Sequence, residues 1–298
     1  MELEKVLMKV ISVFLIILIG VYGSKKNIIT ESLQEGLKDL IINITFPFLV
    51  LTSFSFSYDS SMLSSIVKAF IYSLLSFIIL IGINYIFIKP VSKEKRFIMK
   101  LSNVFSNCSF IGMIAIESIF GAEGMIYAGI FNMTFYSLIW IYTKYICIKN
   151  KVEKNLNPTM LAICIGLFMI ILKIQLPVGI YNSFSIIGEI TTPIGLILVG
   201  SIISKINLKV IFSDYTLYYA AFIKLIVMPL IILGVSKLLK DDSMVICTII
   251  LLQAMPSSEI STIFAKEYAK DYKYSSELVV ISTLLFILTF PIILKLVV

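Results

Sequence analysis

The sequence predicts an all-α, polytopic membrane protein, and three observations support this fold class. Hydrophobic residues make up 59% of the 298 residues, charged residues only 14%, and the mean hydropathy is +1.00, values far outside the range of soluble domains. Apolar runs of the length needed to cross a bilayer recur along the chain. Two of these runs are interrupted by polar, helix-breaking residues, and the interruptions occupy matching places in the two halves.

The apolar runs predict ten transmembrane helices. In order along the chain, they cover residues 6–22, 37–56, 65–88, 97–119, 126–148, 159–174, 183–204, 217–238, 244–265 and 278–297. The first run could also be a signal peptide, because Gly23 and Ser24 follow a short apolar core. We favour a helix, because the internal repeat described below needs it. The connections are short, so no soluble domain of any size is expected.

The positions of Lys and Arg predict that both termini face outward. Seventeen basic residues then fall on the inner side: Lys25, Lys26, Lys38, Lys89, Lys93, Lys95, Arg96, Lys100, Lys144, Lys149, Lys151, Lys154, Lys205, Lys209, Lys266, Lys270 and Lys273. Seven fall on the outer side: Lys5, Lys9, Lys68, Lys173, Lys237, Lys240 and Lys295. Cytoplasmic loops are enriched in basic residues, so this orientation in the cell membrane is favoured. The net charge of +7 is thereby explained by topology and lipid headgroups, without nucleic acid.

The two halves of the chain resemble each other. Residues 39–53 align with residues 185–200, which places Pro47 over Pro193 and Asn43 over Glu189. Residues 109–124 align with residues 257–271 at an offset of about 148. Each half holds five predicted helices, an odd number, so the second half enters the membrane in the opposite sense. We therefore predict two inverted five-helix repeats, residues 1–148 and 159–298, joined by a cytoplasmic linker at 149–158. A chance likeness of two proline-bearing apolar helices is the alternative.

The polar interruptions are the candidate binding site. The fourth run offers Asn103, Ser106, Asn107, Ser109 and Gly112, and the ninth offers Gln253, Pro256, Ser257, Ser258 and Glu259. Lipid cannot satisfy the backbone groups that such breaks expose, so they are expected to line a polar cavity. Freed carbonyl groups suit a cation and half-helix N-termini suit an anion. Hydrogen bonds between neighbouring helices are the purely structural alternative.

Three further side chains are candidates because ionisable or polar groups inside spans are costly. Lys224, deep in the eighth run, is expected to pair with a buried carboxylate, Glu189 or Glu259, or with an anionic substrate, although a snorkelling lysine is also compatible with the sequence. Asn43 and Glu189 each lie about one turn before a proline that is expected to kink its helix. Glu189 and Glu259 are the candidates for coupling to H⁺ or Na⁺. The chain contains no histidine, which excludes a histidine proton relay.

No cofactor or metal is predicted. Cys108, Cys147, Cys164 and Cys247 lie in or beside spans without metal-ligand spacing, so packed free thiols are expected rather than a disulfide framework or a zinc site. HExxH, GxSxG and GxGD motifs do not occur in the sequence, so an intramembrane enzyme is not expected.

Several motifs together resemble those of the auxin efflux carrier family. They are NCSFIG followed by FGAEGMIYAGIFN, then PIGLILVGSII, KLIVMP and AMPSSEISTIFAKEY. The resemblance spans nearly the whole chain and implies ten helices in two inverted repeats, with broken helices four and nine crossing. It carries site roles to Asn107, Ser109 and Gly112 and to Pro256, Ser257 and Ser258. Plant members have a proline where this chain has Cys108, and they have a long loop between helices five and six that this chain lacks.

Together these features predict a secondary transporter of small organic anions, such as mono- or dicarboxylates, working by alternating access around the crossing. The expected partners are an organic acid and membrane lipids, with a homodimer also compatible. A sodium-coupled symporter or cation/proton antiporter of the same fold is the alternative, and a channel is a further one.

Overall fold

The structure, a computed structural model, describes residues 2–55, 62–147, 158–172, 174–204 and 213–297. Its regular elements are helices, and one isolated antiparallel bridge joins Ser106 to Ser257. Within the described ranges, five helical stretches are long and apolar enough to cross a membrane: Leu63–Phe87, Glu123–Cys147, Val178–Ile202, Tyr215–Leu239 and Tyr272–Val297. An all-helical, polytopic membrane protein is the architecture that these lengths and compositions support.

The first helices include most of the first two predicted runs but begin four to six residues earlier. They are α1 (Glu2–Lys25), α2 (Glu31–Leu40), the π-helical turn η1 (Ile41–Thr45) and α3 (Phe46–Ser53). The Thr30 hydroxyl accepts a hydrogen bond from the Leu33 amide and so caps α2. The widened turn η1 ends two residues before Pro47, which cannot donate to the preceding turn of the helix.

The next helices contain the first break and a sharp bend. They are α4 (Leu63–Phe87), α5 (Lys93–Ser102), the π-helical turn η3 (Cys108–Gly112) and α6 (Met113–Cys147). Inside α6, Gly121 has φ +62° and ψ −151°, a conformation that only glycine adopts readily. This bend separates the end of the fourth predicted run from the fifth without an intervening loop.

The second half of the chain also contains continuous and broken helices. Its helices are α7 (Pro158–Leu172), α8 (Val178–Glu189), α9 (Thr191–Ile203), α11 (Tyr215–Phe222), the π-helical turn η4 (Ile223–Val227), α12 (Met228–Leu239), α13 (Met244–Gln253), α14 (Ile260–Glu267) and α15 (Tyr272–Val297). The predicted linker 149–158 lies outside the described residues apart from Pro158.

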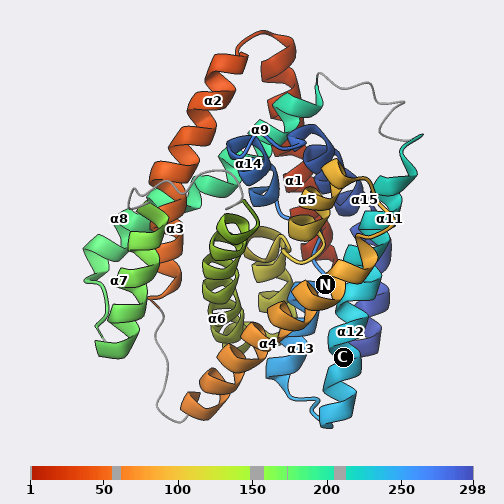
Figure 1. The fold of residues 1–298 in the computed structure, drawn as a ribbon. Helices are drawn as coiled ribbons and strands as arrows, with labels where there is room; N and C mark the ends of the chain where they lie inside the picture. Colours follow the sequence, from red (N-terminus) through yellow and green to blue (C-terminus); the bar gives the residue numbers. More distant parts are fainter. Residues whose placement is uncertain (1, 56–61, 148–157, 173, 205–212, 298) are drawn as a thin grey trace.

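The helix contacts fall mainly into two groups. In one group, α1 packs along α9, and α3 packs against α7 and α8. In the other, α4 and α13 pack against α6, while α11 and α14 pack against α15. Figure 1 shows α3, α7 and α8 together on one side of the molecule and α11, α12 and α15 on the other.

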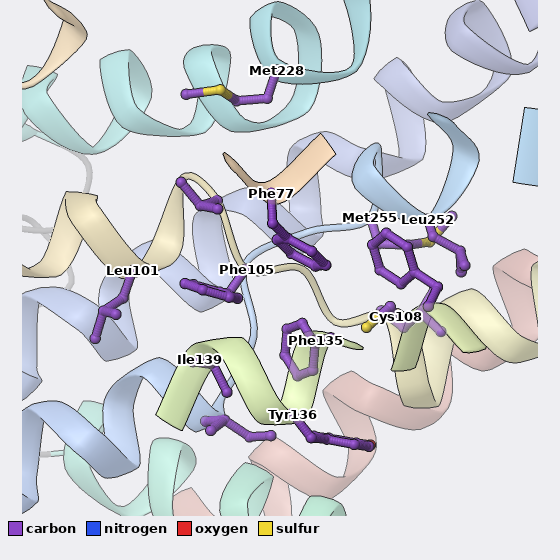
Figure 2. Close-up of a cluster of buried hydrophobic side chains, with 14 of the residues drawn as sticks. Phe77, Leu101, Phe105, Cys108, Phe135, Tyr136, Ile139, Met228, Leu252 and Met255 are labelled. Carbon is purple, nitrogen blue, oxygen red and sulfur yellow. The ribbon is translucent and has the colours of Figure 1, made fainter. Parts of the chain in front are cut away.

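A buried aromatic cluster fixes the first break inside the second group (Figure 2). Phe105 stacks on Phe77 of α4 at a ring-centroid distance of 5.4 Å and meets Phe135 of α6 edge-on at 5.7 Å. All three side chains are fully buried. The apolar contacts on both sides of Phe105 hold the non-helical backbone in one place.

Ion pairs lie at the ends of the helices. Lys38 of α2 contacts Glu267 of α14 at 2.9 Å, and Lys95 of α5 contacts Asp214, the N-cap of α11, at 2.5 Å. Lys68 of α4 contacts Asp241 in the α12–α13 connection at 2.6 Å. These pairs tie neighbouring helices together where the apolar segments end.

The four cysteines are free thiols. Cys108 and Cys247 are buried and Cys147 is partly buried, as expected for packed thiols, but Cys164 on α7 is exposed. The expectation of packing is therefore wrong for Cys164, because the sequence gives the position of a residue in an apolar helix but not the direction of its side chain.

Candidate functional site

Two helix breaks cross inside the molecule. The chain leaves the helix between Ser102 and Cys108, and again between Gln253 and Ile260. At the crossing, the Asn107 amide donates to the Pro256 carbonyl at 2.7 Å, and the Ser258 amide donates to the Phe105 carbonyl at 3.2 Å. Each break thus provides hydrogen-bond partners for backbone groups that the other break exposes. An unwound segment needs such partners where lipid or apolar side chains surround it.

Side chains tie the crossing to the helices beside it. The Ser257 hydroxyl donates to the Ser102 carbonyl at 3.0 Å, and the Ser257 amide donates to the Ser282 hydroxyl of α15 at 3.1 Å. Pro256 has no amide hydrogen and cannot continue a helix. Serine and asparagine compete with helical hydrogen bonds through their side chains, so the local sequence explains why both helices stop here.

Lys224 reaches the crossing from the eighth apolar run. Its side chain is fully buried, and its Nζ donates to Ser106 Oγ at 2.6 Å and to the Gln253 carbonyl oxygen at 3.1 Å. Gln253 is the last residue of α13, so the amino group faces the carbonyl, partially negative end of that helix. A charged lysine amino group has three N–H donors, and two of those of Lys224 have these acceptors.

The same polar cluster extends to α4. Ser106 Oγ also lies 3.4 Å from Gln253 Oε1, and Gln253 Nε2 donates to Ser76 Oγ at 3.4 Å. The Lys224 amino group therefore donates to two uncharged oxygens, and Gln253 links these to Ser76 of α4.

Glu259 lies at the crossing with a different set of partners. Its side chain is buried, and its Oε2 accepts from Asn107 Nδ2 at 2.9 Å. The hydroxyls of Thr192 and Ser258 interact with the same carboxylate. A Cβ placed on Gly195 of α9 would lie 3.0 Å from Glu259 Cγ, so the missing side chain there makes room for Glu259.

Among the residues that the structure describes, neither Lys224 nor Glu259 forms an ion pair. The expected pairing of Lys224 with Glu189 or Glu259 is therefore not what the described side chains do. An unpaired charge in a low-dielectric interior is costly, so both groups call for an explanation beyond stability.

Most of the predicted site residues meet at the crossing. Besides Lys224 and Glu259, they are Asn107, Gln253, Pro256, Ser257 and Ser258. Ser109 lies beside them and accepts from Tyr136 of α6 at 2.5 Å. Gly112 packs against Leu252 and Met255, since a Cβ there would lie 2.7 Å from Leu252 Cδ2.

Three predicted residues lie elsewhere. Asn103 is buried one turn before the crossing and donates to Asn84 of α4 at 3.0 Å. Asn43 is exposed and donates to the Asp39 carbonyl of its own helix, and Glu189 is exposed and accepts from Ser185. The structure does not bring Asn43 or Glu189 to the buried residues of the crossing.

Ser106, one of the predicted polar interruptions, also lies at the crossing. Three contributors were not among the predicted residues. Ser76, Tyr136 and Thr192 stand in helices, and their sequence surroundings do not distinguish them from other hydroxyl-bearing residues of spans.

The crossing is closed to solvent. Asn107, Lys224, Ser258 and Glu259 each expose 3% or less of their surface. A cavity of about 450 Å³ lies elsewhere, between the ends of α3 and α8 and the middle of α6, and is lined by Ser55, Met125, Ile126, Gln175, Leu176, Val178 and Tyr181. It contains none of the residues at the crossing.

Apolar helices around a buried crossing of two broken segments define a polytopic helical membrane protein with a polar centre. A family model described as "Membrane transport protein" matches residues 5–151 and again residues 143–294. The chain therefore belongs to this family, the auxin efflux carrier family, and is a membrane transporter. No curated protein matches the chain.

Proposed function

We propose that this transporter is a secondary carrier of small organic anions, such as mono- or dicarboxylates, and that the solute binds at the crossing of the two breaks. The observation that carries the proposal is Lys224: a fully buried amino group with two neutral acceptors and no carboxylate partner among the described residues. A charged lysine there attracts an anion strongly, because the surrounding dielectric constant is low.

The polar groups around Lys224 suit a carboxylate ligand. Asn107, Gln253 and the serines of the crossing offer amide and hydroxyl donors. The third N–H of the Lys224 ammonium group is available to a substrate oxygen. We assign Glu259 the coupling role, as a site for H⁺ or Na⁺, while the exposed Glu189 lies outside this proposed centre.

Alternating access is the proposed mechanism, because the crossing is closed to solvent. The group of helices around α6, α13 and α15 would move relative to the group around α1, α3 and α9 and expose the site to each side in turn. Inverted repeats give two states of nearly equal energy for such a movement.

Two sets of contacts support the proposed architecture of ten spans in two inverted repeats. Thr45 and Thr191, which the alignment of the halves superimposes, are hydrogen-bonded to each other at 2.8 Å. The breaks pair in the antiparallel sense, with Ser106 opposite Ser257. Equivalent segments meet in this way when a two-fold axis passes between them.

The test is binding and transport by the purified protein. We expect thermal stabilisation by organic acids from a panel including malate, malonate and indole acetate, and uptake of the same labelled acids into liposomes. Lys224→Gln should weaken binding by about thirtyfold or more, the usual cost of removing one member of a buried charge pair. Lys237→Gln, at an exposed lysine of the same apolar run, is the matched control.

Failure of the wild-type protein to move any of these acids under any ion gradient would contradict the proposal. Unchanged affinity in Lys224→Gln would remove that residue from the site.

A cation/proton antiporter is a second candidate, and the buried Glu259 is the observation that favours it. Sodium- or potassium-driven proton movement in liposomes without any organic acid would support it, whereas the anion carrier requires an acid for turnover.

A further inference from the structure

We propose that the Lys224 side chain is the built-in cation of the crossing, so that this carrier moves its anion without sodium. The inference rests on the proposed function and specifies how the same site is charged. Its basis is the position of Nζ between Ser106 Oγ and the Gln253 carbonyl oxygen.

The oxygens around Lys224 are those that would otherwise suit an alkali cation. Broken membrane helices bind sodium through carbonyl groups at the end of a half-helix, and Gln253 supplies such a carbonyl at the end of α13. The Ser106 hydroxyl and the Gln253 side-chain oxygen add uncharged ligands. The Lys224 amino group, at 2.6 and 3.1 Å from two of these oxygens, already uses them.

A widened helical turn in the eighth run positions the Lys224 amino group. Lys224 lies in the π-helical turn η4, which stands before Pro229, and η4 packs against α15. Such widened turns often occur at functional positions in helices. A sodium ion bound to the same oxygens would lie within a few ångströms of the ammonium group and be repelled by it.

Glu259 does not restore a sodium site at these oxygens. Its carboxylate accepts a hydrogen bond from Asn107, lies near the hydroxyls of Thr192 and Ser258, and forms no ion pair with Lys224. A solute anion can therefore be neutralised by Lys224 alone, which leaves Glu259 for a proton.

The experiment compares cations rather than substrates. Uptake of a labelled organic acid, chosen as the best of the panel above, is measured in liposomes containing sodium, potassium or choline chloride. We expect wild-type uptake to change by less than twofold among the three salts. Lys224→Ala should lose at least tenfold in choline and regain at least threefold with sodium or with methylammonium, a small cation that fits the space left by the side chain.

Two variants control for packing. Lys224→Met removes the charge but fills the space, so it should stay inactive in every salt. Lys237→Ala, at an exposed lysine, should behave as wild type. Melting of Lys224→Ala should rise with sodium or methylammonium and that of wild type should not, which gives a binding readout independent of transport.

The outcomes separate this inference from the proposed function. Wild-type uptake that requires sodium would overturn the inference and leave the organic anion carrier standing. Absence of uptake in all salts would overturn the proposed function itself. A folded Lys224→Ala that is equally inactive, and melts equally, in all three salts and in methylammonium would also overturn the inference.

Discussion

At the scale of single residues, the crossing combines two buried charges with different surroundings. Lys224 donates to a hydroxyl and to a backbone carbonyl. Glu259 accepts from the Asn107 side chain, and an amide oxygen at position 259 could accept the same hydrogen bond. Glutamine has nearly the same shape as glutamate, so Glu259→Gln preserves the hydrogen bond from Asn107 and removes only the charge and the exchangeable proton.

We therefore expect Glu259→Gln to keep the fold and to lose the stimulation of uptake by an inward proton gradient. Coupling between two ligands is usually worth about fivefold to 150-fold in affinity, and this factor should fall to near one. Uptake into liposomes with and without a pH gradient measures it, and Glu123→Gln, at an exposed position, serves as control. A variant that still responds fully to the gradient would show that the proton binds elsewhere.

At the scale of elements, the packing of α1 on α9 depends on two glycines. A Cβ on Gly200 would lie 1.9 Å from the Ile17 carbonyl oxygen, and a Cβ on Gly20 would lie 2.1 Å from the Ile197 carbonyl oxygen. Small residues let membrane helices approach closely, and here the backbones meet with no room for a methyl group.

Gly200→Ala should therefore destabilise the protein by about 1–3 kcal/mol, the usual cost of overpacking. Gly82→Ala on α4 is the matched control, because a Cβ there meets nothing within 4 Å. The measurement is thermal unfolding in detergent. Equal melting temperatures for the two variants would mean that α1 and α9 separate without cost.

The connection between α12 and α13 depends on Asp241. Burial disfavours its charge, but hydrogen bonds from Lys68, the Ser243 amide and Tyr72 outweigh burial and hold the pKa of Asp241 well below its usual value. A lowered carboxyl pKa contributes stability that is complete above the unfolded pKa of about 4 and is lost as the pH falls below it.

Asp241→Asn should consequently lower the melting temperature at pH 7 and have a smaller effect near pH 3, where wild-type Asp241 approaches its own pKa. Melting curves of both proteins across this range test the sign. Asp242→Asn, next to it, is the control. A destabilisation that grows towards acid pH would contradict this account of Asp241.

At the scale of the whole molecule, the sequence predicted where the helices break and that Lys224 is buried, but not the directions in which side chains point. Pro256 and Asn107 mark the breaks because proline, serine and asparagine disrupt helices wherever they stand. The burial of Lys224 followed from the cost of a charge in a span. The partners of Lys224 could not be predicted, because they depend on how three helices and two breaks meet in space. For the same reason, the alignment of Asn43 with Glu189 did not indicate that both side chains are exposed.

The proposed inverted repeat makes a prediction about the two sides of the membrane. Lys93, at the start of α5, and Lys240, before α13, occupy nearly equivalent places in the two halves at the offset of about 148 residues, and both are exposed. Because five spans separate the equivalent positions, they should lie on opposite sides, with Lys93 inside and Lys240 outside according to the distribution of basic residues.

In a variant without native cysteines, Lys240→Cys should react with a membrane-impermeant maleimide in intact cells, whereas Lys93→Cys should react only after permeabilisation. Mass shift of the labelled protein measures both, and the cysteine-free parent gives the background. Labelling from the same side would contradict the inverted repeat. Labelling of Lys93→Cys from outside and of Lys240→Cys from inside would still agree with the inverted repeat, because an odd number of spans in each half reverses the orientation of the second half. That result would place both termini inside and would mean that the distribution of basic residues does not set the orientation.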